Sequence, residues 1–184
     1  MRPFAEPLSP AMARRFAAGK FILTRDALGV ADALAALLRA RQCEVVIVEP
    51  EFLADEARLL ERSHAADVAG PIAGVVHLAQ LGSPALTGQE APAAWRAAVQ
   101  ANEKSLFLLL RELSAQLGDG SHAVAASDLG GLFGREGTAQ PVLRPVSGMV
   151  GALKSLRDER PALRIKAVDL DPARSAARSE EHTS

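Results

Sequence analysis

The chain has 184 residues, 48% of them hydrophobic, which is enough for one compact domain with its own core. Its 21 lysines and arginines are balanced by 22 aspartates and glutamates, so the net charge of -1 leaves no cationic excess to neutralise a nucleic acid. The single cysteine, Cys43, excludes an internal disulfide and a multi-cysteine metal site, and no apolar run approaches the roughly 18 residues of a membrane helix. We therefore expect a soluble, cytoplasmic α/β domain without nucleic-acid or membrane partners.

The first part of the chain alternates between strand and helix patterns. Residues 1–19 hold three prolines among small residues and are interpreted as a linker or disordered arm. The apolar, β-prone run 21–24 predicts the first strand, and apolar residues at helical spacing over 30–38 predict the helix after it. The β-branched run 44–48 predicts a strand that is buried on both faces. The ordered part of the chain therefore opens with a β-α-β unit.

The rest of the chain continues this alternation. The predicted elements are a short charged helix, a buried strand, a long helix with or without a break, a weaker strand, a helix with one apolar face and a closing strand, over residues 51–62, 72–79, 91–117, 123–127, 146–156 and 164–170. Gly118 and Gly120 are expected to stop the long helix. Strands that alternate with helices imply right-handed crossovers and a parallel sheet. The predicted fold class is α/β: a Rossmann-like, three-layer α/β/α domain over residues 20–172, with a mostly parallel sheet of about five strands.

The last residues carry a different signal. We expect residues 173–184 to be a disordered tail, and residues 178–184 are similar, residue for residue, to one translated frame of a common sequencing-adapter oligonucleotide. Either these residues are an artefact and the natural protein continues past Ala177, or they form an ordinary polar terminus. Both interpretations exclude them from reasoning about the fold.

The first strand-to-helix turn decides whether the chain could hold a dinucleotide. Glycines in such a turn let the backbone approach the diphosphate, and the N-terminus of the next helix supplies N–H donors. Gly29 is present, but Arg25 and Ala31 stand where glycines are needed, and Asp26 adds a negative charge where an anion would bind. The turn is therefore either a degraded cofactor loop or an ordinary turn in which Asp26 caps the helix or interacts with its dipole.

Other polar residues give no complete catalytic or metal-binding pattern. Glu49 ends the second predicted strand, where an acid can contact ribose hydroxyls in NAD-type folds, but a solvated acid is the simpler interpretation. His77 has no metal-ligand partner at a known spacing and is predicted to be a packed, hydrogen-bonded core residue. Ser127 lacks the G-x-S-x-G context of a nucleophile, and Lys154 is expected on the surface. We therefore predict no catalytic residue and no metal site.

Several segments together resemble the short-chain dehydrogenase/reductases. They are the opening strand and turn, the strand that precedes the active-site helix of that family, the helix asparagine and the closing G-L-x-K-x-L-x-x-E-x-P … V-D-L stretch, at residues 21–31, 74–79, Asn102 and 148–170. Within the family, the chain looks like the N-terminal half of a ketoreductase region in a polyketide or polyunsaturated-fatty-acid synthase. The likeness covers residues 20–172.

This resemblance implies a structural role. In such ketoreductases the N-terminal half does not bind NADPH, and the following half carries the glycine-rich loop and a Ser–Tyr–Lys catalytic set. The chain has no tyrosine, and Val150 stands four residues before Lys154, so the phenolic proton donor of the reduction is missing. Thr24 and Gly29 are what a vestigial cofactor site would retain.

The resemblance therefore implies a non-catalytic structural subdomain that binds no cofactor itself and supports a downstream NADPH-dependent β-ketoacyl reductase half. Its partners would be that catalytic half and other synthase domains. Two alternatives remain open at this point. One is an NAD(P)H-dependent short-chain dehydrogenase/reductase with an unusual acid that acts on a ketoacyl substrate, and the other is an interaction domain with a different partner.

Overall fold

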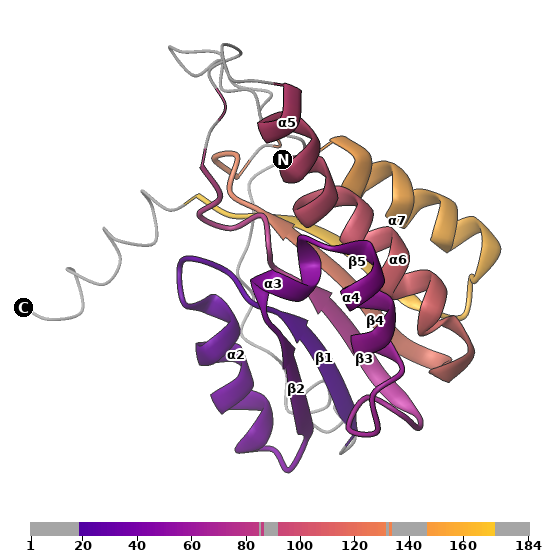
Figure 1. Ribbon diagram of the computed structural model, residues 1–184. Coiled ribbons are helices and arrows are strands. Elements are labelled where there is room, and N and C mark those ends of the chain that lie inside the picture. Colours follow the sequence, from indigo (N-terminus) through magenta and orange to yellow (C-terminus); the bar gives the residue numbers. More distant parts are fainter. Residues whose placement is uncertain (1–18, 85, 87–91, 132, 134–146, 172–184) are drawn as a thin grey trace, which may run out of the picture.

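The computed structural model describes residues 19–84, 86, 92–131, 133 and 147–171, and its centre is one β-sheet (Figure 1). The five strands, in the order β2-β1-β3-β4-β5 across the sheet, are β1 (Lys20–Thr24), β2 (Glu44–Val48), β3 (Ile72–His77), β4 (Leu117–Ser127) and β5 (Arg164–Asp169). Each pair of neighbouring strands is parallel. The predicted α/β fold class, with its parallel five-stranded sheet, is confirmed.

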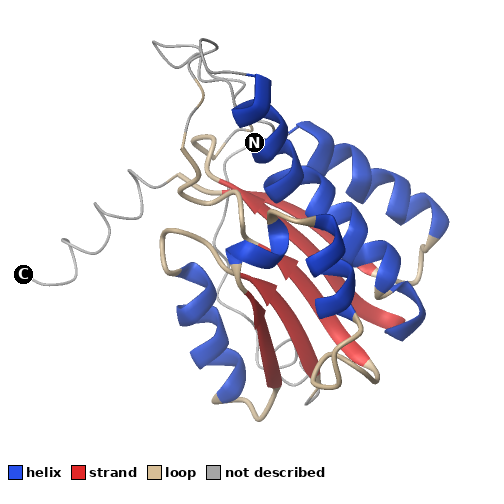
Figure 2. Ribbon diagram, in the orientation of Figure 1, coloured by secondary structure: helices blue, strands red, loops and turns tan. Residues whose placement is uncertain are grey.

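Helices connect the strands and cover both faces of the sheet (Figure 2). They are α2 (Val30–Arg39), α3 (Pro50–Leu53), α4 (Glu56–Ser63), α5 (Pro92–Val99), the π-helical turn η1 (Gln100–Lys104), α6 (Ser105–Glu112), the 3-10 turn η2 (Ser114–Gln116) and α7 (Ser147–Glu159). Successive strand residues point to opposite faces. Phe21 belongs to the same buried cluster as Ala35 of α2, whereas Ile22 belongs to the cluster that contains Leu59 of α4 and Leu109 of α6. One cluster therefore lies on each face of the sheet, and the domain has three layers: helix, sheet and helix.

The path of the chain across the sheet reverses after β2. β2 lies on one side of β1, and the next strand, β3, lies on the other side, with β4 and β5 beyond it. The connections that leave β1 and β3 therefore run in opposite directions. Open α/β sheets bind ligands at such a switch point, beyond the carboxyl ends of the strands. The ends of β1 and β3 are thus the place to look for a site.

The segment 51–62, predicted as one helix, forms the two short helices α3 and α4. The break occurs at Asp55, which has extended backbone and whose carboxylate accepts the N–H of Arg58 at 3.1 Å. Aspartate favours this N-cap geometry over the interior of a helix, because its side chain bonds to nearby backbone groups. A local capping preference therefore overrides the helical spacing of the apolar residues.

The predicted long helix and the strand after it also have different limits. The π-helical turn η1 interrupts the helix, which ends at Glu112, and β4 begins at Leu117 rather than at residue 123. Gly118 and Gly120, expected to stop the helix, lie inside β4. The pairing of β4 with β3 is irregular there, because its register shifts after the Ile72–Leu117 pair. This irregular, polar part of the strand has no alternating apolar pattern by which the sequence could reveal it.

Two predicted segments lie outside the described residues: the arm 1–19, of which only Gly19 is described, and the tail 173–184 with its adapter-like residues 178–184. The domain limits at residues 20 and 172 therefore stay predictions. In the part of the chain that the structure describes, none of the helices has the length and apolar character needed to cross a lipid bilayer.

Gly74 lies at a point of β3 that has no room for a side chain. A Cβ atom on Gly74 would lie 2.8 Å from Cε1 of Phe21 and 3.1 Å from Cβ of His122. Phe21 is 3% exposed, so its ring has no free space to move into. We expect Gly74→Ala to lower the free energy of unfolding by about 1–3 kcal/mol, measured by urea denaturation. Gly118→Ala is the control, because nothing lies within 4 Å of its added Cβ, and equal losses in both variants would contradict the steric explanation.

Candidate functional site

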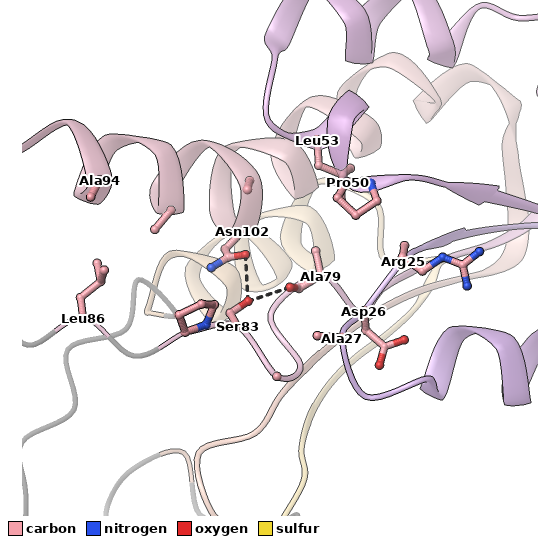
Figure 3. A pocket seen from close by; sticks show the side chains of 14 residues that line it. Arg25, Asp26, Ala27, Pro50, Leu53, Ala79, Ser83, Leu86, Ala94 and Asn102 are labelled. Atoms are coloured by element: carbon pink, nitrogen blue, oxygen red, sulfur yellow. Dashed lines mark hydrogen bonds between the residues drawn. The ribbon is translucent and has the colours of Figure 1, made fainter.

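A cavity of about 410 Å³ lies at the carboxyl ends of β1, β2 and β3. It is lined by the turns that follow β1 and β3, by α3 and by the helical segment α5–η1 (Figure 3). Most of the lining is apolar, and the polar members are Arg25, Asp26, Ser83 and Asn102. The cavity therefore occupies the switch point and contains Arg25 and Asp26, which the sequence singles out in the first turn.

The carboxylate of Asp26 caps helix α2. Its Oδ2 accepts the N–H groups of Leu28 (2.9 Å) and Val30 (3.0 Å), and its Oδ1 accepts that of Ala31 (2.6 Å). Val30 and Ala31 begin α2, so their N–H groups have no acceptor within the helix. Asp26 is 8% exposed, which shields these bonds from water. Of the two sequence interpretations, the structure favours the ordinary turn with a capping aspartate.

This cap conflicts with the binding of a dinucleotide at the turn. The backbone N–H groups that would bind a diphosphate at a helix N-terminus already donate to a carboxylate of the chain. An incoming phosphate would have to displace Asp26 and would meet its negative charge. The residues present therefore do not fit the diphosphate of NADPH or NAD.

Arg25, the residue before Asp26 in the turn, forms ion pairs with Glu49 and Asp32. Its Nε and Nη2 each lie 2.8 Å from a carboxylate oxygen of Glu49, and its Nη1 lies 2.5 Å from Oδ1 of Asp32. The hydrogen bonds that Arg25 donates to Glu49 and Asp32 raise the pKa of Arg25, and the hydrogen bonds that Glu49 accepts from Arg25 lower the pKa of Glu49. Glu49, expected to be a solvated acid, is instead paired with Arg25. Both of its carboxylate oxygens accept hydrogen bonds from Arg25, so neither is free to contact a ribose hydroxyl.

Thr24 and Gly29, the two residues predicted for a vestigial cofactor site, differ in their surroundings. Thr24, at the end of β1, is fully buried, and its hydroxyl oxygen accepts the N–H groups of Leu78 (2.7 Å) and Ala79 (3.0 Å). These bonds join β1 to the turn after β3. Gly29 is exposed and precedes α2 with a φ of 79°, which favours glycine. That Thr24 and Gly29 are the remnants of a cofactor site stays a prediction.

Two buried polar side chains, those of His77 and Gln80, contact the backbone carbonyl oxygen of Asn102 in η1. His77 Nε2 lies 2.8 Å from this oxygen, and Gln80 Nε2 donates to it at 3.3 Å. His77 is fully buried, and this burial lowers its pKa to about 4. A neutral imidazole is therefore present at pH 7, with Nε2 as the donor. The prediction of a packed, hydrogen-bonded core histidine is confirmed.

The side chain of Asn102 faces the cavity next to Ser83, a residue that the sequence does not single out. The Ser83 hydroxyl donates to the carbonyl oxygen of Ala79 at 2.8 Å and lies 3.4 Å from Oδ1 of Asn102 (Figure 3). Asn102 is 7% exposed. No local motif links these residues, and only the fold brings them together across the cavity.

Ser127 lies at the end of the next strand, β4. Its hydroxyl is fully buried and donates to Oδ1 of Asp169 at 2.6 Å. The same carboxylate accepts the N–H groups of Leu129 (2.7 Å) and Phe133 (2.8 Å). These bonds join β4 to β5 and hold the start of the turn after β4, so the hydroxyl of Ser127 has a structural role.

The remaining sequence candidates lie away from the cavity or in the core. Lys154 is exposed on α7, as expected, and Val150 packs against the core one turn earlier. Cys43 is buried and free. Within the described ranges, no three His, Cys, Asp or Glu side chains gather in a group that could hold a metal ion.

Comparisons with known proteins identify the fold. No family profile matches the chain, and no curated protein matches it. Among solved structures, a small-chain dehydrogenase matches with a TM-score of 0.68 and 15% identity, over 83% of this chain and 82% of the other. A small-chain dehydrogenase in complex with NADPH has a TM-score of 0.66 and 14% identity, over 82% and 69% of the two chains. A short-chain dehydrogenase/reductase from Serratia marcescens has a TM-score of 0.58 and 16% identity, over 88% and 74%. The chain therefore has the fold of the short-chain dehydrogenase/reductases.

Proposed function

We propose that this chain is the non-catalytic structural subdomain of a ketoreductase in a polyketide or polyunsaturated-fatty-acid synthase. It presents its sheet and helices to a downstream half, and that half binds NADPH and reduces the β-ketoacyl substrate. Its partners are this catalytic half and other domains of the synthase. The chain itself binds no cofactor.

The observation that carries the proposal is the cap of α2 by Asp26. Three backbone N–H groups that a cofactor phosphate would need are bound to a buried carboxylate, and Arg25 holds both oxygens of Glu49 beside them. The chain also has no tyrosine to donate a proton to a carbonyl. The chain therefore keeps the fold, while its cofactor turn and the tyrosine proton donor are both replaced. This combination suits a subdomain that supports a reaction carried out by another domain.

One observation favours a second candidate, an NAD(P)H-dependent short-chain dehydrogenase/reductase that acts on a ketoacyl substrate. Solved structures with the same fold are described as complexes with NADPH or NAD, and this chain keeps a cavity at the switch point of its sheet. In this candidate the cofactor would displace the carboxylate of Asp26 from α2. A different side chain would also have to donate the proton.

A titration with NADPH separates the two candidates. We expect no saturable increase in nicotinamide fluorescence with the unmodified chain at up to about 1 mM NADPH. The double variant Arg25→Gly/Asp26→Ser removes the ion pair and the capping carboxylate, and we expect it to bind at least about tenfold more tightly than the unmodified chain. Saturation of the unmodified chain at micromolar NADPH would overturn the structural role in favour of the enzyme.

The synthase context has its own test. Sequencing the gene beyond the codon for Ala177 should find an open frame that encodes a second β-α-β unit with a G-x-G-x-x-G turn. A stop codon directly after the described domain would contradict the synthase proposal and favour an interaction domain.

A further inference from the structure

The helical segment α5–η1 forms one wall of the cavity at the ends of β1, β2 and β3. We propose that η1 is a conformational switch. In its π-helical form the cavity is open, and in an α-helical form Trp95 of α5 turns into the cavity and fills it. The two states belong to this chain alone and do not depend on the structural role proposed above.

The residues around η1 favour an uninterrupted α-helix. Residues 93–112 contain neither proline nor glycine, and most of them are alanine, leucine, glutamate, glutamine, lysine or arginine. The hydroxyl of Ser105 donates to the carbonyl oxygen of Ala101 at 2.6 Å, a bond that serine also makes within regular helices. The π-helical turn therefore depends on contacts from outside the helix.

Two buried donors at the end of β3 supply these contacts. In η1 the N–H of Ser105 bonds to the carbonyl oxygen of Gln100, its fifth neighbour rather than its fourth. This change opens carbonyl groups of the turn to other donors, and that of Asn102 lies 2.8 Å from Nε2 of His77 and 3.3 Å from Nε2 of Gln80. His77 and Gln80 are at most 1% exposed, so a straight helix that reclaimed this carbonyl would leave both donors buried without a partner.

α5 is the half of the interrupted helix that is free to turn. None of its residues is buried, whereas Leu106, Leu109 and Leu110 anchor α6 in the core. A π-helical turn accommodates one residue more than an α-helical one. Its conversion would therefore rotate α5 by about 100° and move it by about 1.5 Å along its axis relative to α6. Each residue of α5 would then take the place of the residue before it.

This rotation replaces small side chains at the cavity by large ones. Ala94 and Ala98 line the cavity from α5 (Figure 3), and Trp95 and Val99 would take their places. Trp95 is 41% exposed in the open form. The mostly apolar cavity of about 410 Å³ has room for an indole ring, whose burial is favourable. Burial of Trp95 thus favours the closed form, and the two donors to Asn102 favour the open form.

The fluorescence of Trp95 reports the switch, because the chain has no other tryptophan and no tyrosine. The double variant His77→Phe/Gln80→Leu removes both donors. We expect its emission to move to shorter wavelength and its quenching by acrylamide to fall at least about threefold, since packed interiors exclude the quencher. The control is His122→Phe, which changes a ring on the α2 side of the sheet, 6.5 Å from that of Phe21, and should leave the emission unchanged. Unchanged emission in the folded double variant, or an equal shift in the control, would overturn the proposal.

An exchange of two neighbouring residues tests the direction of the rotation. The variant Ala94→Trp/Trp95→Ala places the tryptophan on the cavity side of the open form, so its emission should lie at shorter wavelength than that of the unmodified chain. Addition of His77→Phe/Gln80→Leu should move this emission to longer wavelength, the reverse of the shift in the unmodified background. A general loosening of the core would move both tryptophans in the same direction, and that result would contradict the switch.

A one-residue insertion covers the case in which the double variant does not fold. An alanine inserted between Val99 and Gln100 leaves His77 and Gln80 in place and turns α5 by the same single step with the π-helical turn retained. The emission of Trp95 should again move to shorter wavelength. If Trp95 stays exposed to acrylamide in this variant, the cavity does not receive it and the proposal is wrong. None of these measurements involves NADPH, so this proposal and the proposed function can fail separately.

Discussion

Replacement of Asp26 by alanine is expected to lower the free energy of unfolding by about 3 kcal/mol. The variant leaves the N–H groups of Leu28, Val30 and Ala31 without the carboxylate that accepts them. Hydrogen bonds to a charged group contribute more than neutral ones, and a buried donor without a partner keeps the cost of its desolvation. Water that enters the vacated space recovers only part of this loss. Urea denaturation at pH 7 measures the change.

Two comparisons show whether the loss comes from the bonds of Asp26. Asp55→Ala removes a second capping aspartate, on α4, that accepts one N–H group at 3.1 Å, and should cost about 1 kcal/mol. Asp26→Asn keeps one acceptor oxygen and should fall between the unmodified chain and Asp26→Ala. A loss in Asp26→Ala no larger than in Asp55→Ala would mean that the additional bonds contribute nothing.

The same variant exposes the anion site that Asp26 occupies. Once the carboxylate is gone, the first N–H groups of α2 can bind a small anion. Sulfate should therefore raise the Tm of Asp26→Ala more than that of the unmodified chain, because an anion that binds only the folded state stabilises it. An equal rise in both proteins would show that the helix terminus is not what the anion binds.

Part of the alternation of strands and helices could be predicted because β2 and β3 are compact, largely apolar runs. Residues 44–48 and 72–77 carry this signal in their own side chains, and β2 and β3 form there. β2 is the edge strand, so Val45 and Ile47 on one of its faces are only half-buried, and the predicted burial on both faces is incomplete. The start of β4 could not be predicted, since the strand begins where Leu117 pairs with Ile72 of β3, and Gly118 and Gly120 lie in the irregular stretch that follows this pair. Strand pairing is a long-range property, which a local pattern does not record.

The candidate site shows the same division. Arg25 and Asp26 could be identified from the sequence because a missing glycine and an added charge are visible one residue at a time. Their partners could not, since Arg25 meets Glu49 only because β1 and β2 are neighbours with Thr24 opposite Val48. Ser83 and Asn102, separated along the chain by α5, approach each other only in the fold.

Acid is expected to destabilise the protein through His77, by about 3 kcal/mol between neutral pH and pH 4. Burial lowers the pKa of His77 from 6.5 to about 4 in the folded protein. As the pH falls below 6.5, the unfolded chain binds a proton that the folded chain excludes, so the free energy of unfolding decreases. The contribution is fully present above pH 6.5 and is lost by about pH 4.

A comparison with His77→Gln isolates this effect. Glutamine can still donate to the carbonyl oxygen of Asn102 but does not titrate, so the free energy of unfolding should fall less steeply between pH 7 and pH 5 in the variant. The ion pairs of Glu49, Asp67 and Glu112 also lose stability in acid, but they lower the pKa values of these carboxyl groups, so this loss occurs mainly below pH 5. Half-burial lowers the pKa of His122 as well, so His122→Gln should remove a smaller part of the slope. Parallel pH profiles of the unmodified chain and His77→Gln, measured by urea denaturation, would show that the imidazole in the core is open to protonation before the protein unfolds.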